Sequence, residues 1–252
     1  MSSAVSSIKR GVSTRLPPSV VFETQGKRGD RRASDHGVLP DLMPLDELRP
    51  TQMAVGMRAV GAKRRKIERI ADSRRKLRNF LEKRPVPAVL GPKARPYIID
   101  HHHLSLALWQ SDVDEVFVSV VADLSDLPKR AFLSAMAARG WLHAYDGSGR
   151  KACPTRLPKA IHQLRPDPYR DLAWAVREAG GFEKTNAPFI EFRWANFFRD
   201  RIPEAMLSRD FDRAHKRAMR MARSGEARHL PGSLSGFWDH GPGAPSQQIS
   251  HN

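Results

Sequence analysis

The chain contains one cysteine, Cys153, in 252 residues. A single thiol can form neither an intrachain disulfide nor a cysteine-based zinc site, so the sequence favours a reducing compartment. Long hydrophobic runs are also missing, and no segment approaches the roughly 18 apolar residues that a membrane-spanning helix needs. We therefore predict a cytoplasmic protein that makes no use of a membrane.

Both ends of the chain lack apolar periodicity. Residues 1–38 are basic, and the first twenty residues include Ser, Lys and Arg but no acid. This composition fits either a disordered tail or an organellar transit peptide, and we interpret it as a tail. Residues 231–252 are rich in Gly, Pro, Ser and Gln, which predicts a second disordered tail.

Positive charge dominates the composition, with a net charge of +16. Residues 57–84 contain twelve bases and three acids. The apolar residues of this segment recur at helical spacing: Val60, Ile67, Ile70, Leu77 and Leu81. The pattern predicts one long basic helix with a narrow buried stripe, bent or broken near Gly61. Such a helix either binds a polyanion or is a solvated face that keeps the chain soluble, and we favour the first interpretation.

The remaining patterns predict an α+β domain over residues 39–140. Its elements are a strand and turn at 42–52, a hairpin of strands at 86–90 and 97–99, a helix at 102–110, a strand at 116–121 and a helix at 126–139. A helical extension is predicted over residues 141–230, packed on this domain. Its helices are expected at 157–164, 168–179, 188–201 and 203–224. The aromatic residues at helical spacing in the extension predict a core: Trp174, Phe189, Phe192, Trp194, Phe197 and Phe198.

The most informative motif is the run Asp100-His101-His102-His103 at a predicted strand-to-helix junction. Three imidazoles are poor core residues, whereas ring nitrogens beside helix-start amides suit an anion, a nucleotide phosphate or a metal. Consecutive helical residues point about 100° apart, so at most two of the histidines would ligate one ion, with Asp100 or Glu191. We predict no metal site. The structural alternative is that one histidine caps the helix and another is bonded to Asp100.

Five segments, spread in order between Leu42 and Ile202, resemble the ParB-like nuclease family of the ParB/sulfiredoxin-like superfamily. They are residues 48–52 (LRPTQ), 86–92 (VPAVLGP), 97–104 (YIIDHHHL), 167–174 (DPYRDLAW) and 191–195 (EFRWA). The resemblance implies a bacterial protein with a small mixed sheet and helices, followed by a C-terminal helical extension. The wider fold includes CTP-hydrolysing partition proteins, sulfiredoxins, free-serine kinases and proposed DNases.

In the free-serine kinases of this fold, phosphates rest on a loop that resembles Asp-Gly-His-His-Arg. The present chain keeps Asp100, His102 and His103, but it has His101 for the glycine and Leu104 for the arginine. The resemblance therefore implies that another base, such as Arg58 or Lys63, supplies the missing cation.

Two other reactions of the superfamily need residues that this chain places differently. Gln52 stands where the kinases have a glutamate base, so serine phosphorylation would need Glu47 or Glu191 instead. The loop has no cysteine, which argues against the sulfiredoxin reaction.

We therefore expect a protein that binds nucleic acid, with phosphodiesterase (nuclease, hydrolase) activity at this loop. His102 and His103 would stabilise phosphate charge or act as acid and base, Asp100 would orient them, and Gln52 and Glu191 would line the same pocket. The structural alternatives are that Gln52 lies in an ordinary turn and that Glu191 is a solvated partner of Arg170 or Arg193, and for Glu191 we favour the alternative. The expected phosphate-binding residues are His101, Arg58, Lys63, Arg64, Arg65 and Lys66. One alternative is a nucleotide-binding phosphotransferase or NTPase that uses Mg²⁺, and another is a non-catalytic DNA-binding module. The nuclease and nucleotide hypotheses require the imidazoles and the bases of residues 58–66 to share one electropositive hollow.

Overall fold

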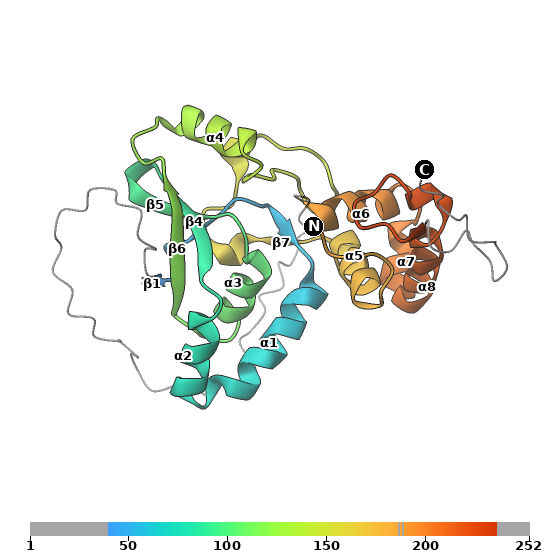
Figure 1. The fold of residues 1–252 in the computed structure, drawn as a ribbon, viewed down its shortest axis with the longest axis horizontal. Helices are drawn as coiled ribbons and strands as arrows, with labels where there is room; N and C mark the ends of the chain where they lie inside the picture. The colour runs from blue at the N-terminus through green and yellow to red at the C-terminus, as the bar shows by residue number, and fades with distance from the viewer. Residues whose placement is uncertain (1–39, 186, 188, 236–252) are drawn as a thin grey trace, which may run out of the picture. The chain divides into compact units, whose positions relative to one another are not determined.

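The computed structural model describes residues 40–185, 187 and 189–235 (Figure 1). The predicted N-terminal tail lies outside these residues, as does most of the predicted C-terminal tail. The first five residues of that second tail are packed, because the Gly232 carbonyl accepts a hydrogen bond from Glu183 N and Ser235 is 1% exposed. Within the part of the chain that the structure describes, each helix is too short or too polar to cross a bilayer.

The first half of the described chain contains a five-stranded mixed sheet with the strand order β1-β6-β4-β5-β2. The strands are β1 Asp41–Pro44, β2 Arg49–Pro50, β4 Val86–Gly91, β5 Arg95–Ile98 and β6 Glu115–Asp123. The pair β4 and β5 is antiparallel, which confirms the predicted hairpin, and a 3-10 turn at Pro92–Ala94 joins them. Strand β6 is parallel to β4 and antiparallel to β1, so the mixed sheet of the predicted α+β class is present.

Helices cover both faces of this sheet (Figure 1). The main core combines Ala88 and Ile98 of the hairpin with residues of α1 (Met57–Ala71) and α3 (His102–Trp109). Successive side chains of a strand point to opposite faces, and Val89 and Tyr97 accordingly pack against α4 (Lys129–Ala138).

The single helix predicted over residues 57–84 is wrong in one respect. The segment forms two helices, α1 and α2 (Arg74–Glu82), and the break lies at residues 72–73 rather than near Gly61. The Ser73 side chain accepts a hydrogen bond from Lys76 N and caps α2, so a serine inside a basic periodic pattern marks the boundary.

The second half of the described chain is helical. Its helices are α5 Pro168–Glu178, α6 Ile190–Arg199, α7 Glu204–Arg209 and α8 Phe211–Ala222, with a 3-10 turn at Gly225–Ala227. The helix predicted at 157–164 is wrong, because 3-10 turns at Pro154–Arg156 and Ile161–Gln163 take its place. The helix predicted at 203–224 is divided at Asp210, whose side chain accepts from Arg213 N and caps α8.

A separate core holds these helices together. Trp194, Phe197 and Phe198 are buried in it, as the aromatic spacing predicts. Phe192 is buried outside this core, against the His143 ring, and Trp174 and Phe189 are half-buried. Two short parallel strands, β3 Ala54–Val55 and β7 Arg165–Pro166, link the start of α1 to the start of α5.

Candidate functional site

The Asp-His-His-His run lies between β5 and α3, at the predicted junction. His101 is the N-cap residue and adopts a left-handed conformation with φ of 65°. A residue with a Cβ atom pays on the order of 1 kcal/mol for this backbone conformation, which glycine adopts freely. The Asp100 Oδ1 atom accepts a hydrogen bond from His101 N at 2.6 Å, which holds the turn.

The first turn of α3 begins without a side-chain cap. Because His102, His103 and Leu104 begin the helix, their N–H groups also have no acceptor within the helix itself. These amides also form the positive end of the helix dipole, a location that attracts anions.

His102 is an anchor between β2 and α3. Its side chain is buried, and Nε2 accepts a hydrogen bond from Thr51 N at 3.1 Å, so the ring proton lies on Nδ1. The Thr51 hydroxyl donates in turn to the Ile98 carbonyl at 2.8 Å. Burial lowers the pKa of His102 to about 3, so the ring is neutral at pH 7 and is not poised to exchange a proton there.

His103 makes the equivalent bond to α1. Its Nε2 atom accepts from Gly56 N at 3.1 Å, which leaves Nδ1–H as the remaining donor of a half-buried ring. Burial lowers the pKa of His103 well below its ordinary value, and the charge of Arg170 acts in the same direction. The ring is thus a neutral donor at pH 7.

Positive charge exceeds negative charge around this loop. The charges that interact with Lys63, His101 or His103 come from Lys63, Arg84, Arg170, Arg177 and Lys184, and from the acids Asp100 and Glu191. Although Lys63 is exposed as a whole, partial desolvation lowers the pKa of its ammonium group, and Glu191 and Asp100 oppose that shift. The excess of cations makes the loop electropositive.

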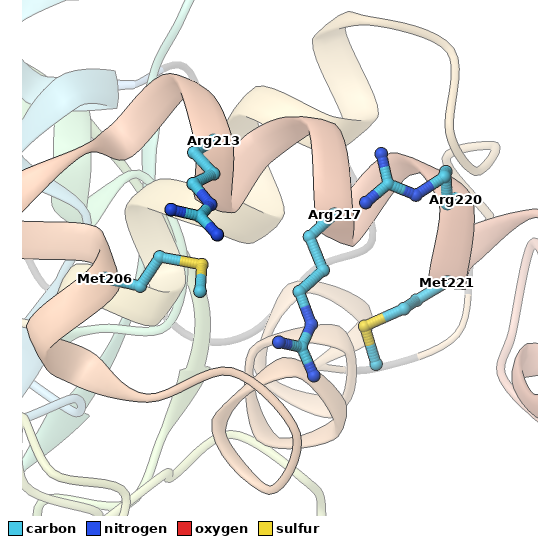
Figure 2. A pocket seen from close by; sticks show the side chains of 5 residues that line it. All are labelled: Met206, Arg213, Arg217, Arg220 and Met221. Carbon is cyan, nitrogen blue, oxygen red and sulfur yellow. The ribbon is translucent and has the colours of Figure 1, made fainter.

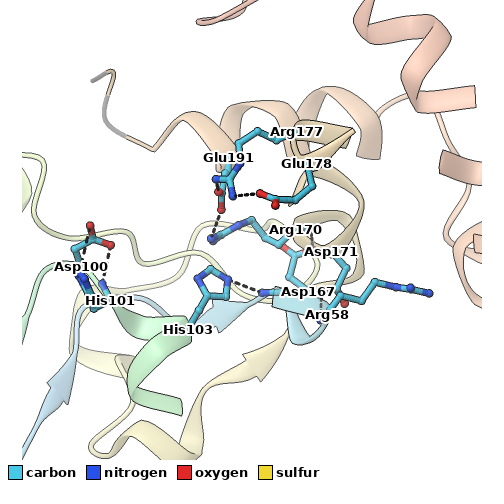
Figure 3. A network of polar contacts seen from close by, with 11 residues as sticks. Arg58, Asp100, His101, His103, Asp167, Arg170, Asp171, Arg177, Glu178 and Glu191 are labelled. Carbon is cyan, nitrogen blue, oxygen red and sulfur yellow. Dashed lines mark hydrogen bonds and ion pairs between the residues drawn. The ribbon is translucent and has the colours of Figure 1, made fainter. Parts of the chain in front are cut away.

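Arg170 is the most buried of these cations, with 3% of its side chain exposed. Its Nη2 atom lies 3.3 Å from Glu191 Oε2, and the guanidinium stacks 3.6 Å above the Phe192 ring. Its Nε and Nη1 atoms have no acceptor among the residues that the structure describes. In Figure 3 the guanidinium lies between Glu191 and His103.

Glu191 is engaged by two arginines, since Arg177 pairs with its other oxygen. The carboxylate is therefore held as a structural ion-pair partner of Arg170, the alternative to a catalytic carboxylate.

The structure separates the predicted bases of residues 58–66. The charge of Lys63 lowers the pKa of His101 in the loop. The Arg58 guanidinium, in contrast, stacks 3.5 Å above the Phe211 ring and is turned away from the histidines (Figure 3). Arg64 pairs with Glu68 at 3.1 Å. The other two predicted bases, Arg65 and Lys66, have exposed side chains on α1.

Gln52 is 9% exposed and forms an isolated bridge with His143. Its Oε1 atom is buried and has no donor within the described residues. The His143 ring stacks on Tyr145 and lies 3.6 Å from the centroid of Phe192, and burial lowers the pKa of His143 to about 3. Sequence reasoning missed His143. It named Arg170 only as a solvated partner of Glu191, although Arg170 lies in the segment 167–174 that carries the family resemblance.

The donor set at the loop is poor for a resident metal ion. Across residues 40–185, 187 and 189–235 there is no group of three or more His, Cys, Asp or Glu side chains that could hold one. The carboxylate of Asp100 takes no part in the Glu191 ion pairs, and 78% of the Asp100 side chain is exposed. Mg²⁺ often binds through one or two carboxylates and substrate phosphates, so Asp100 fits an ion that arrives with a nucleotide.

Comparisons with known proteins identify one family and one similar solved structure. The family described as "Putative ParB-like nuclease" matches residues 42–200, more than half of the chain. A solved structure, the crystal structure of protein Atu1540 from Agrobacterium tumefaciens, is 44% identical with a TM-score of 0.68. The match covers 77% of this chain and 97% of that chain. None of the curated proteins matches.

Proposed function

Because the chain belongs to the ParB-like nuclease family, we propose that it binds phosphate groups of nucleic acid at the N-terminus of α3. The observation that carries this proposal is the concentration of unpaired donors and cations at one helix start. Residues 102–104 supply uncapped amides there, the His103 ring supplies an Nδ1–H group, and the charges of Lys63 and Arg170 act on that ring.

Neutral histidines suit this role. A neutral imidazole still carries one ring N–H group, and this group can donate a hydrogen bond to a phosphate oxygen. A phosphate beside His103 would favour its protonated form and raise its pKa, so binding at this site would take up protons as the pH falls. The low pKa values of His102 and His103 favour binding over acid–base chemistry at pH 7 in the unliganded protein.

Phosphodiester cleavage at the same loop is the second candidate function. The family description favours it, and exposed Asp100, 3.9 Å from His101 Nδ1, provides a carboxylate at the edge of the phosphate site. A nicking assay on plasmid DNA separates the two candidates. Loss of cleavage in Asp100→Asn at unchanged DNA affinity would establish phosphodiesterase activity at this loop. Equal cleavage by the wild type and the variant would reject a catalytic role for Asp100.

The binding proposal is tested by the affinity of a fluorescently labelled DNA duplex as a function of salt. Lys63→Gln removes the cation that faces the loop, and the matched Lys66→Gln removes the same charge one turn further along α1. Each lost phosphate contact lowers the slope of log K against log salt by about 0.9. We expect this loss for Lys63→Gln and a smaller one for Lys66→Gln. Equal effects would mean that α1 acts as a diffuse basic surface.

A melting experiment separates nucleic acid from a nucleotide as the ligand. ATP or CTP with Mg²⁺ should leave the melting temperature nearly unchanged if the site is built for a polymer backbone. A large nucleotide-dependent increase would favour a nucleotide enzyme instead.

A further inference from the structure

A second basic hollow lies between α7 and α8, apart from the loop histidines. It has a volume of about 360 Å³ and is lined by Met206 of α7 and by Arg213, Arg217, Arg220 and Met221 of α8. Figure 2 shows Arg213 and Arg217 extending from α8 into the space beside the two methionines. Neither the sequence reasoning nor the proposed phosphate site at α3 accounts for this surface.

The arginines of the hollow have no acidic partner among the described residues. All three are exposed, and none lies within ion-pair distance of a carboxylate in the part of the chain that the structure describes. Other arginines do have such partners, for example Arg199 with Asp167 at 2.8 Å. Arg217 makes one backbone contact, in which Nη2 donates to the Arg201 carbonyl at 3.1 Å. The charge of the hollow is therefore available to an anionic ligand.

The pattern of α8 explains why the arginines share one side of the helix. Ala214, Ala218 and Ala222 recur every four residues and are completely buried, which brings α8 close to its neighbours. The arginines occur at positions i, i+4 and i+7 beside that stripe. At a rise of 1.5 Å per residue, the row from the first to the last arginine spans about 10.5 Å along the axis.

We propose that this hollow binds the phosphodiester backbone of nucleic acid as a second contact region. One DNA strand carries a phosphate every 3.4 Å along the duplex axis, so the row of arginines spans about three phosphate intervals of one strand. Guanidinium groups suit phosphate oxygens because their planar N–H pairs bind bidentately. Met206 and Met221 supply adaptable apolar contacts for the sugars between the phosphates. The inference shares its ligand class with the proposed function but does not depend on the α3 site.

The test is the salt dependence of duplex DNA affinity in the full chain. The triple variant R213Q/R217Q/R220Q removes the row. The control R130Q/R139Q/R156Q removes the same charge from exposed positions outside α8: Arg130 in α4, Arg139 at the end of α4, and Arg156 in the 3-10 turn Pro154–Arg156. Helix α4 is well separated from α8 in Figure 1. We expect the α8 variant to lower the slope of log K against log salt by about 2 to 3, with about tenfold or greater loss of affinity at 0.1 M salt. The α4 variant should change the slope by less than half as much. An unchanged slope in the α8 variant, or equal losses in the two variants, would overturn the proposal.

A second variant guards against misfolding. R213Q/R220Q keeps the hydrogen bond from Arg217 to the Arg201 carbonyl, and it should still lower the slope by about 1.8 with an unchanged melting temperature. A wild-type slope in this folded variant would also overturn the proposal.

Combination with Lys63→Gln separates this inference from the α3 site. If only the α8 hollow binds DNA, Lys63→Gln leaves the salt slope unchanged while the α8 variant lowers it. If Lys63→Gln lowers the slope and the α8 variant does not, the proposal for the α8 hollow is rejected and the α3 site stands. A peptide rich in Asp and Glu is the competing ligand. If it binds more tightly than the duplex and loses affinity in the α8 variant, the hollow is a protein-docking site and the nucleic-acid assignment is wrong.

Discussion

Replacement of His102 by glutamine tests the buried, neutral state of this histidine. The folded protein holds the pKa of His102 at about 3, against an ordinary value of 6.5. Between these two pH values the unfolded chain binds a proton that the folded chain does not. The free energy of unfolding therefore falls as the pH falls through this window, and the stability due to the neutral ring is fully present only above pH 6.5.

The magnitude follows from proton linkage. From pH 6.5 to pH 5, one proton costs about 2 kcal/mol at 1.36 kcal/mol per pH unit. His102→Gln cannot titrate, yet its side-chain oxygen can still accept the hydrogen bond from Thr51 N. We expect this variant to lose about 2 kcal/mol less stability than the wild type between pH 7 and pH 5, with the other buried histidines contributing equally to both proteins.

Urea unfolding followed by tryptophan fluorescence at pH 7, 6 and 5 measures the difference. His229→Gln, at an exposed histidine, is the control and should follow the wild type. His102→Leu lacks the acceptor, and at pH 7 it should be about 1 kcal/mol less stable than His102→Gln, because Thr51 N is then left unpaired. Equal pH dependence in His102→Gln and the wild type would refute the buried neutral ring.

Two further predictions concern carboxylates at the start of α5: Asp171, which bonds to α1, and Asp167, which pairs with Arg199 of α6. Burial raises the pKa of Asp171 to about 6 from 3.8, so the folded chain holds an extra proton between these values and stability falls as the pH rises through them. Asp171→Asn keeps an acceptor for the hydrogen bond from Arg58 N. At pH 7 this variant should be more stable than the wild type by at most about 3 kcal/mol, and at pH 4 it should have no such advantage. A stability difference that does not depend on pH in urea unfolding would contradict this prediction. Arg199→Ala leaves the buried Asp167 carboxylate without its guanidinium and should cost about 3 kcal/mol in the same assay, whereas Arg64→Ala, at an exposed pair, should cost less than about 1 kcal/mol. Equal costs for these two variants would argue against a buried ion pair.

Elements with strong local signals were predictable from the sequence. The hairpin of β4 and β5 follows two β-rich runs around Gly91, and α3 begins at the expected junction. The aromatic spacing of α6 identifies Trp194 and Phe198 as core residues because burial on one helix face imposes that period.

Helix boundaries were less predictable because the residues that set them occur within otherwise periodic patterns. Ser73 and Asp210 each cap a helix by accepting a backbone hydrogen bond. The start of α1 shows the limit of local reasoning. Its backbone donors are met by His103 from α3 and by Asp171 from α5, both distant in sequence.

The electrostatic arrangement of the candidate site required the tertiary structure. The sequence shows a run of bases around Lys63 but does not say which one faces the loop. One local signal existed, since Lys63 follows the buried Ala59 by four residues and therefore lies on the same side of α1. No local pattern predicts that Arg170 is buried beside His103, because α5 and α3 are brought together only by the fold.

The most direct test of the central claim is an NMR titration of the isotope-labelled protein with a short DNA duplex. Binding of a phosphate at the start of α3 predicts that the amide signals of His102, His103 and Leu104 and the ring Nδ1 signal of His103 shift together and saturate with the measured affinity. If the duplex binds while these signals stay unmoved, the phosphate site is not at the α3 N-terminus and the account is wrong.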